Sequence, residues 1–392
     1  MKTRVYLKIF ITLFVTCFVQ SELFAQEISK PLSNEDEARL VEYLKNNWAS
    51  PEQYIINKFK NYDVVLLAED HRIKHNVLLV QALIPHLYKA GVYNIGMEFG
   101  ASEDQAALDS LVNAENYDEN KARKLMFNYN VGWAFKEYMD VYRKAWEFNK
   151  SLPEGARKFR IVNLSYKYDW SGYNGVRTPE NAKKVFHKGG TESYRAALVK
   201  KEILDKHEKI LIITGTIHAF TRYAMPVFDY NAENFSTLDY RHMGNLIYKY
   251  ADKKACTILL HFPFYSRTIG YGRLMYPANG AIDQVMKNFE NKRVGFDLTG
   301  TPFGELRDTS FYSTGYNDFK LSDIADGYVY QMPFNEYEGC TIDDKFLTDE
   351  NWIEAQKQFP DPDINTRPKS LQEYYEKIRA YADIQKIYGA IK

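Results

Sequence analysis

The hydrophobic positions of the chain follow two alternating patterns, one typical of buried strands and one typical of amphipathic helices. Residues 63–69 (DVVLLAE) form a continuous apolar run, as expected for a strand covered on both faces. Residues 76–91 then show helical spacing up to Gly91, and residues 93–100 form the next apolar run. A strand, a helix and a strand in this order predict a βαβ unit with two parallel strands.

The same alternation continues along most of the chain. Further strands are predicted at residues 158–164, 209–215, 256–261, 293–298 and 327–332. Helical patterns separate them, at residues 102–115, 119–128, 133–150, 178–188, 192–206, 239–251 and 280–290. Such alternation predicts an α/β fold, a mostly parallel sheet flanked by helices.

Three features modify this simple alternation. Residues 101–157 form a long helical insertion, and residues 368–388 predict a C-terminal helix packed on the outside. Two loops rich in Gly, Tyr and Phe, 262–280 and 300–319, each follow a strand. We therefore expect these aromatic loops over the carboxyl edge of the sheet, where ligands of open α/β sheets bind. Residues 26–392 are predicted to form a single α/β domain.

The first 25 residues have the pattern of a secretory signal peptide. Lys2, Arg4 and Lys8 precede an apolar stretch, and Ala25 offers a small residue for cleavage. Cys17 would be the site of a lipid anchor, but the larger Thr16 before it favours simple cleavage. The apolar stretch is too short for a comfortable membrane span. These residues predict an exported protein, periplasmic or extracellular, with no membrane span in the mature chain.

The charge balance narrows the range of partners. The 392 residues carry 51 basic and 51 acidic side chains, and removing residues 1–25 takes away three basic residues and one acidic residue, which leaves a net charge of −2. Such a balance argues against nucleic acid or an anionic membrane as a partner. Cys256 and Cys340 would remain, and export permits a disulfide between them. Two cysteines make neither a disulfide framework nor a zinc knuckle.

Polar side chains mark the ends of the predicted strands. Glu69 and His71 end the first strand, and Glu98 ends the second. Later strands end at Asn163 and Ser165, at Gly215-Thr-Ile-His218, and at His261. Because parallel strands direct their carboxyl ends to one edge, acids and imidazoles from distant segments converge there. The sequence therefore predicts a site built on Glu69, His71, Glu98 and His218.

Each of these residues also has a purely structural interpretation. Glu69 and Glu98 could cap the helices that follow them, and His218 could be a buried, hydrogen-bonded side chain. His75 lies four residues after His71, so it either supports the site from the same helical face or only contacts the start of the helix. His261 is a weaker candidate for substrate binding, since loop packing would explain it equally well. His86 and His207 lie in predicted helices and are interpreted as structural.

Several familiar catalytic motifs are absent from the sequence. The chain has no G-x-S-x-G elbow, which argues against a standard α/β-hydrolase serine. It has no H-E-x-x-H motif and no Walker A loop, and the GYG at residues 270–272 does not complete a dinucleotide fingerprint. The candidate chemistry therefore rests on the carboxylates and imidazoles.

These residues resemble a known superfamily, which contains erythromycin esterases, ChaN-like haem-binding lipoproteins and TraB/TIKI proteins. The resemblance covers roughly residues 60–300 and rests on Glu69-x-His71, on Glu98 at the end of a strand, and on Gly-x-x-His218. Two features depart from its pattern. Ala68 stands where the family usually has Gly, and the Glu69-x-His71 spacing is similar to the ChaN and TIKI branches rather than to the esterases.

The resemblance and the residues together leave two main chemistries open. The first is hydrolysis of an ester or amide. In its metal-free form His71 would be the general base, Glu69 or Glu98 would orient it, and His218 would stabilise the oxyanion or leaving group. In its metal-assisted form Glu69, His71, Glu98 and His218 would bind Mn, Zn or Fe, which would activate a water.

The second chemistry is binding without catalysis. The ChaN-like relatives imply a haem or iron ligand, and Tyr265 and Tyr271 in the first aromatic loop are candidate contacts because Tyr can ligate haem iron. In the hydrolytic interpretation the same two tyrosines, with His75 and His261, would contact substrate. A third interpretation is a fold without activity that recognises a peptide or glycan. The predicted ligand is thus a small molecule, a peptide or haem.

Overall fold

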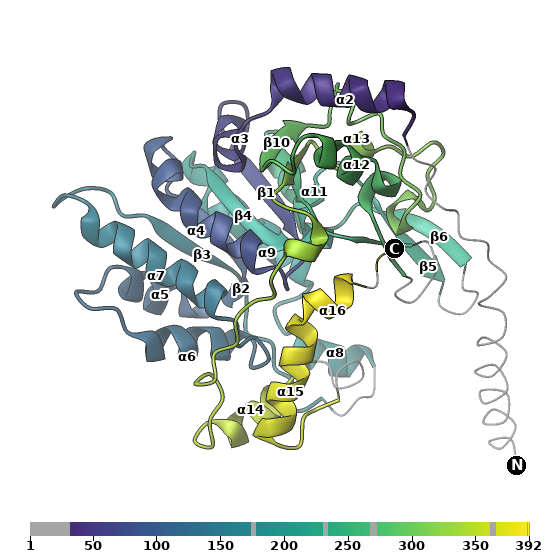
Figure 1. Ribbon diagram of the computed structural model, residues 1–392. Coiled ribbons are helices and arrows are strands. Elements are labelled where there is room, and N and C mark those ends of the chain that lie inside the picture. Colours follow the sequence, from purple (N-terminus) through teal and green to yellow (C-terminus); the bar gives the residue numbers. More distant parts are fainter. Residues whose placement is uncertain are drawn as a thin grey trace, which may run out of the picture.

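A seven-stranded sheet forms the centre of the protein (Figure 1). The computed structural model describes residues 32–173, 178–229, 234–266, 273–360, 366–389 and 391. The strands run in the order β10-β11-β7-β1-β4-β2-β3, and every neighbouring pair is parallel except β10 and β11. Their bounds are β1 Val64–Glu69, β2 Asn94–Ala101, β3 Arg160–Ser165, β4 Ile210–Gly215, β7 Ala255–Leu260, β10 Val294–Asp297 and β11 Gly327–Tyr330. The predicted fold class, a mostly parallel sheet flanked by helices, is confirmed.

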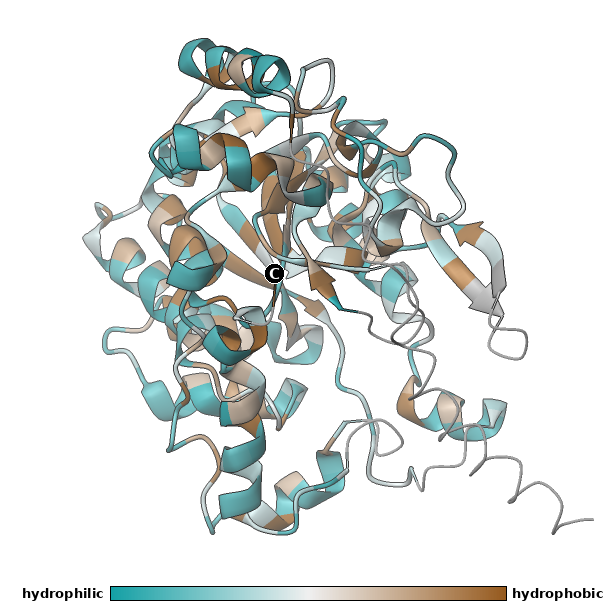
Figure 2. Ribbon diagram, turned by 45° about the vertical axis from the view of Figure 1, so that its right-hand side comes forward, coloured by the Kyte–Doolittle hydropathy of each residue, from teal (hydrophilic) through white to brown (hydrophobic). Residues whose placement is uncertain are grey.

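Helices cover both faces of this sheet, as the continuous apolar runs of the strands require. Successive side chains of a strand point to opposite faces, so Val65 and Leu67 pack in one buried cluster while Val64 and Leu66 pack in the other. The first cluster contains residues of α3 (Pro51–Lys58), α4 (Lys74–Lys89), α5 (Gln105–Val112), α6 (Glu119–Tyr129) and α7 (Lys136–Ser151). The second contains residues of α2 (Asn34–Asn47), α9 (Thr191–Glu202), α11 (Met243–Tyr250) and α12 (Ala281–Asn288). Figure 2 shows the hydrophobic colour concentrated in the strands and on the helix sides turned toward them.

The connections between the strands are less direct than a simple βαβ repeat. β1 and β2 are parallel, but β4 lies between them. Two strands that were not predicted, β5 (Met225–Asp229) and β6 (Asn234–Asp239), pair in an antiparallel manner. The remaining short elements are η1 Ser102–Asp104, α8 Pro179–Val185, η2 Leu204–Lys206, α10 Thr216–Ala219, β8 Phe264–Tyr265, β9 Leu274–Met275, η3 Pro277–Gly280, η4 Phe311–Ser313, α13 Leu321–Ile324 and η5 Phe334–Glu336.

The C-terminal segment folds back onto the helical insertion. α14 (Trp352–Gln358) leads to α15 (Leu371–Ala382) and α16 (Ile384–Tyr388), drawn in yellow-green and yellow in Figure 1. The single helix predicted at residues 368–388 is thus two helices, because Asp383 ends α15 and its side chain caps α16. The hydroxyl of Tyr388 donates a hydrogen bond to Asp70, which ties this segment to the loop after β1.

The described residues bear on only some of the predictions about export, domains, membrane spans and cysteines. Residues 1–25, including Cys17, lie outside the described residues, so the signal peptide and the division into domains stay predictions. None of the described helices is long and apolar enough to cross a bilayer. Cys256 and Cys340 are both buried and both free, so the disulfide that export would permit is not formed.

Candidate active site

The carboxyl end of β1 places Glu69 and His71 in direct contact. Glu69 is the last residue of the strand, and its side chain is completely buried. His71 Nδ1 lies 3.0 Å from Glu69 Oε1, which also accepts a hydrogen bond of 2.7 Å from the hydroxyl of Tyr138. Because a carboxylate only accepts, Nδ1 carries the proton and Nε2 has a free lone pair. The His71 side chain is 23% exposed, so solvent reaches its imidazole ring.

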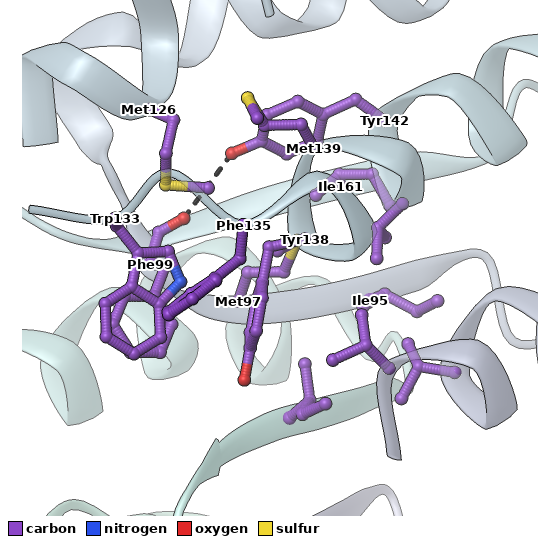
Figure 3. Packing of buried hydrophobic residues seen from close by; sticks show 14 of the residues in the cluster. Ile95, Met97, Phe99, Met126, Trp133, Phe135, Tyr138, Met139, Tyr142 and Ile161 are labelled. Carbon is purple, nitrogen blue, oxygen red and sulfur yellow. Dashed lines mark hydrogen bonds between the residues drawn. The ribbon is translucent and has the colours of Figure 1, made fainter. Parts of the chain in front are cut away.

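Aromatic rings hold the imidazole of His71 in place. Its ring meets Phe99 and Trp133 edge to face, at centroid distances of 4.7 and 5.4 Å. Phe99 and Trp133 are themselves stacked, 4.0 Å apart. Figure 3 shows these two rings beside Phe135 and Tyr138, which come from the loop after α6 and from α7. The helical insertion therefore builds one wall of the site.

An irregularity in β2 brings Glu98 to the same place. β2 pairs with β4 only over Ile95–Met97, and its register with β3 shifts after Met97. Glu98 lies just beyond this point, so its side chain reaches across the end of β4. Its Oε2 accepts hydrogen bonds from the hydroxyl of Thr214 at 2.7 Å and from the backbone N–H of Gly215 at 2.8 Å.

Gly215 allows Glu98 and His71 to approach each other. His71 Nε2 lies 3.9 Å from Glu98 Oε2. A methyl group at Gly215 would lie only 2.7 Å from His71 Nε2, so any larger residue there would displace the imidazole. The glycine is required by close packing at the site.

His218 is the second imidazole of the site and lies between two carboxylates. It belongs to the short helix α10, which directly follows β4. Its Nε2 is 3.3 Å from Glu98 Oε1, and its Nδ1 is 2.6 Å from Glu192 Oε1. Burial alone would lower the pKa of His218, but the Glu98 and Glu192 carboxylates outweigh it and raise the pKa to about 9. His218 is therefore an imidazolium at neutral pH.

Arg195 on α9 supplies the fixed positive charge of the cluster. Its guanidinium is buried and lies 3.2 Å from Glu98 Oε1. Burial would raise the pKa of Glu98, but the charges of His218 and Arg195 hold it well below its ordinary value. The cluster thus holds three carboxylates, Glu69, Glu98 and Glu192, but one guanidinium, which lies beside Glu98 and Glu192, and protonated imidazoles compensate the remaining negative charge.

The negative charge of these carboxylates also acts on His71. Burial alone would lower the pKa of His71, but the hydrogen bond to Glu69 and the charge of Glu98 raise it above the ordinary value of 6.5. The arrangement as a whole is an alternating row of carboxylates and imidazoles in which one imidazole stays protonated and the other can take up a proton.

A group of possible metal ligands lies at the far end of this row. Ligand atoms of Glu192, His218 and His242 lie within 4.8 Å of one another. His242 precedes α11, and its Nδ1 is 3.9 Å from Glu192 Oε2. Of the four metal ligands predicted from sequence, only His218 belongs to this group. Glu98, another of the four, already has the Arg195 guanidinium as its neighbour.

The other residues predicted for the site lie elsewhere or outside the described part. The ring of His75 meets Tyr337, and its Nδ1 accepts a 3.4 Å contact from the Glu338 N–H. His261 is fully buried and contacts Tyr328, Asp283 and Phe334. These contacts link neither histidine to Glu69 or Glu98. Tyr265 is half-buried in β8, and Tyr271 lies outside the described residues.

The loop residues after β1 show that Asp70 does not take part. Its carboxylate accepts hydrogen bonds from the backbone N–H of Arg72 at 3.0 Å and from its Nε at 2.8 Å. Together with the contact from Tyr388, these bonds turn Asp70 away from Glu69 and make it a structural turn residue.

Four residues of the site were missed by sequence reasoning, namely Tyr138, Glu192, Arg195 and His242. Arg195 could have been identified from the sequence, because it lies on the buried face of α9 with Ala196 and Val199. An unpaired charge on that face would be costly, so a charged partner was to be expected. Tyr138 left no such signal, since the chain has 31 tyrosines and many lie on buried helix faces.

Comparison with known proteins gives only structural neighbours. No protein-family model matches the chain, and no curated protein matches it in sequence. A protein from Bacillus cereus is 12% identical, with 80% of this chain and 100% of that chain covered and a TM-score of 0.48. An erythromycin esterase, a mutant of EreC in its open conformation, is 12% identical, with 70% and 91% covered and a TM-score of 0.47. ChaN of Campylobacter jejuni, solved with cofacial haem, is 16% identical, with 54% and 86% covered and a TM-score of 0.34.

Proposed function

We propose that this protein is a hydrolase that cleaves an ester or amide with a water molecule activated by His71. The observation that carries the proposal is the orientation of His71. Its Nδ1 is bound to the buried Glu69, which Tyr138 holds in turn, so Nε2 is the proton acceptor. A base held by a third group in this way is the usual arrangement of an activated nucleophile. We further propose that the protein acts outside the cytoplasm, in agreement with the signal-peptide pattern of residues 1–25.

Each group of the row has a place in the reaction. His71 Nε2 takes a proton from water as the water oxygen bonds to the carbonyl carbon. The positive charge of the His218 imidazolium stabilises the oxyanion that forms. As the bond to the leaving group breaks, His71 gives that group the proton that it took from water, which restores the neutral imidazole. Glu98 is a positioning residue, because it lies between the two imidazoles and stays ionised beside Arg195.

This mechanism predicts a bell-shaped pH profile of kcat/KM. Below its pKa His71 is protonated and cannot accept a proton, so activity rises with pH through an apparent pKa above 6.5. Activity falls again as His218 loses its proton, at about pH 9. The profile is measured with 4-nitrophenyl acetate, read at the isosbestic wavelength of the product so that pH does not change the signal. His218→Gln should remove the alkaline limb and keep the acid limb; an unchanged alkaline limb would contradict the role of His218.

A metal-assisted reaction is the alternative that the ligand group suggests. Glu192, His218 and His242 would hold a divalent ion, and the ion would lower the pKa of a bound water. We favour the metal-free form because the Arg195 guanidinium lies 3.2 Å from Glu98 and 3.9 Å from Glu192, and a permanent cation there opposes a second one.

Chelation and a haem titration test both alternatives on the same protein. We expect dialysis against EDTA to leave the hydrolysis of 4-nitrophenyl acetate unchanged within twofold, and added haemin to give no protein-specific Soret band. Activity that is lost and then restored by Mn²⁺, Zn²⁺ or Fe²⁺ would replace the metal-free form by the metal-assisted one. A Soret band that disappears in Tyr265→Phe would favour the haem-binding alternative.

A further inference from the structure

The four-residue loop that carries His71 depends on a segment far along the chain. Residues 70–73 connect β1 to α4, and Ile73, the residue before the helix, provides no side-chain cap. The first N–H groups of a helix need acceptors from outside the helix. The N–H of Lys74, the first helical residue, is donated to the backbone carbonyl of Glu338 at 3.1 Å. A distant residue therefore supplies the cap that the loop lacks.

Residues 338–340, here called the strap, run along the loop beside His71. The N–H of Cys340 donates to the backbone carbonyl of Arg72 at 2.9 Å. The thiol of the same cysteine is a weak donor to the carbonyl of His71, with sulfur and oxygen 3.6 Å apart. That carbonyl also accepts a hydrogen bond of 3.2 Å from the hydroxyl of Tyr138. The backbone of His71 is thus held by two residues, and one of them belongs to the strap.

The end of α15 packs directly against the strap. Gly339, the middle residue of the strap, forms an antiparallel bridge with Ile73 of the loop. It also lies against Ala382, the last residue of α15, and a methyl group at Gly339 would overlap the Ala382 carbonyl oxygen. Glycine is required here because the two backbones approach so closely. Loop, strap and helix therefore form three layers in direct contact.

The C-terminal helices also hold the two residues that flank His71. Tyr388 of α16 is only 3% exposed, and its hydroxyl donates a hydrogen bond of 3.0 Å to the carboxylate of Asp70. The guanidinium of Arg72 lies over the ring of Tyr381 of α15, at 5.7 Å from its centroid. The residues before and after His71 are therefore both anchored to these helices.

We infer that the strap and Tyr388 position the catalytic base, and that they are positioning residues of the proposed hydrolysis. The inference rests on the proposed function, since it concerns the base of that reaction. His71 Nδ1 must stay 3.0 Å from Glu69 Oε1 for Nε2 to accept a proton. Glu69 belongs to the strand and His71 to the loop, so a shift of the loop changes this distance. A misplacement of about 1 Å can cost about 10²-fold in rate.

Tyr388→Phe tests the inference, because it removes one hydroxyl and leaves the ring in place. We expect kcat for 4-nitrophenyl acetate to fall by roughly ten- to a hundredfold with little change in KM, because the base is displaced. The matched control is Tyr375→Phe, which removes a hydroxyl of α15 that bonds to the Leu347 backbone. It should keep the wild-type kcat. Thermal melts verify that each variant is folded, and an equal fall of kcat in both would overturn the inference.

A second measurement does not depend on hydrolysis. NMR spectra of the full chain with isotope-labelled histidines show which ring nitrogen carries the proton, and His71→Ala identifies the signals of His71. At alkaline pH, where this ring is neutral, we expect the Nδ1–H form in the wild type and a mixture of both tautomers in Tyr388→Phe and Gly339→Ala. Unchanged signals together with unchanged kcat in both variants would overturn the inference alone. A mixture of tautomers in these variants, in a protein whose wild type hydrolyses nothing, would support positioning by the strap and overturn the proposed function.

Discussion

Replacing His71 by alanine is expected to lower kcat/KM for 4-nitrophenyl acetate by about 10²–10⁴-fold, the contribution of a positioned general base. The imidazole is held on one side by Glu69 and on the other by Phe99 and Trp133, so no neighbouring group can move into its place. The remaining activity should lose the acid limb of the pH profile, since the group that titrates there is gone.

The control for this variant is His86→Ala, which removes an exposed histidine from α4. It should keep wild-type activity, and both variants should keep the wild-type circular dichroism spectrum. If His71→Ala retains more than a tenth of the activity with the acid limb intact, another residue is the base. Glu98, whose carboxylate lies 3.9 Å from His71 Nε2, would then be the next residue to test, although its pKa is held too low for an efficient base.

Those parts of the site that lie on strand ends could be predicted from sequence. Glu69, Glu98 and His218 each interrupt or follow an apolar run, and parallel strands leave such residues at one edge. The structure brings these residues and His71 into one connected row. The fold was predictable for the same reason, because continuous apolar runs separated by helical spacing fit few architectures.

The parts that depend on packing between distant segments were not predictable. Glu192 and Arg195 reach the site from α9, and nothing local shows that this helix passes beside Glu98 rather than along another strand. The sequence of the antiparallel strand β10 resembles the sequences of the parallel strands, because an apolar run does not reveal the direction of a strand. The packing of the strap against the His71 loop requires the C-terminal segment to fold back over residues distant in the chain.

Arg195→Met is expected to destabilise the protein by about 3–5 kcal/mol, the usual cost of removing one partner from a buried ion pair. The Arg195 guanidinium is 3% exposed, and it contacts Glu98 as well as the hydroxyl of Ser165. Methionine keeps much of the volume of the side chain but leaves Glu98 without its permanent counter-charge. Urea unfolding at pH 7 measures the loss. Arg143→Met removes a half-exposed ion pair with Glu119 and should cost no more than about 1 kcal/mol.

Adding Glu98→Gln to Arg195→Met separates the charge effect from lost packing. If the uncompensated carboxylate causes the loss, the double variant should be more stable than Arg195→Met alone. An equal or larger loss in the double variant would show that packing and the bond to Ser165 dominate. Activity provides a second, independent reading of Arg195→Met. Without the guanidinium, Glu98 stabilises the protonated imidazole of His71 more strongly, because less of its charge is neutralised. The acid limb of the pH profile should then move to higher pH, which lost packing alone would not cause.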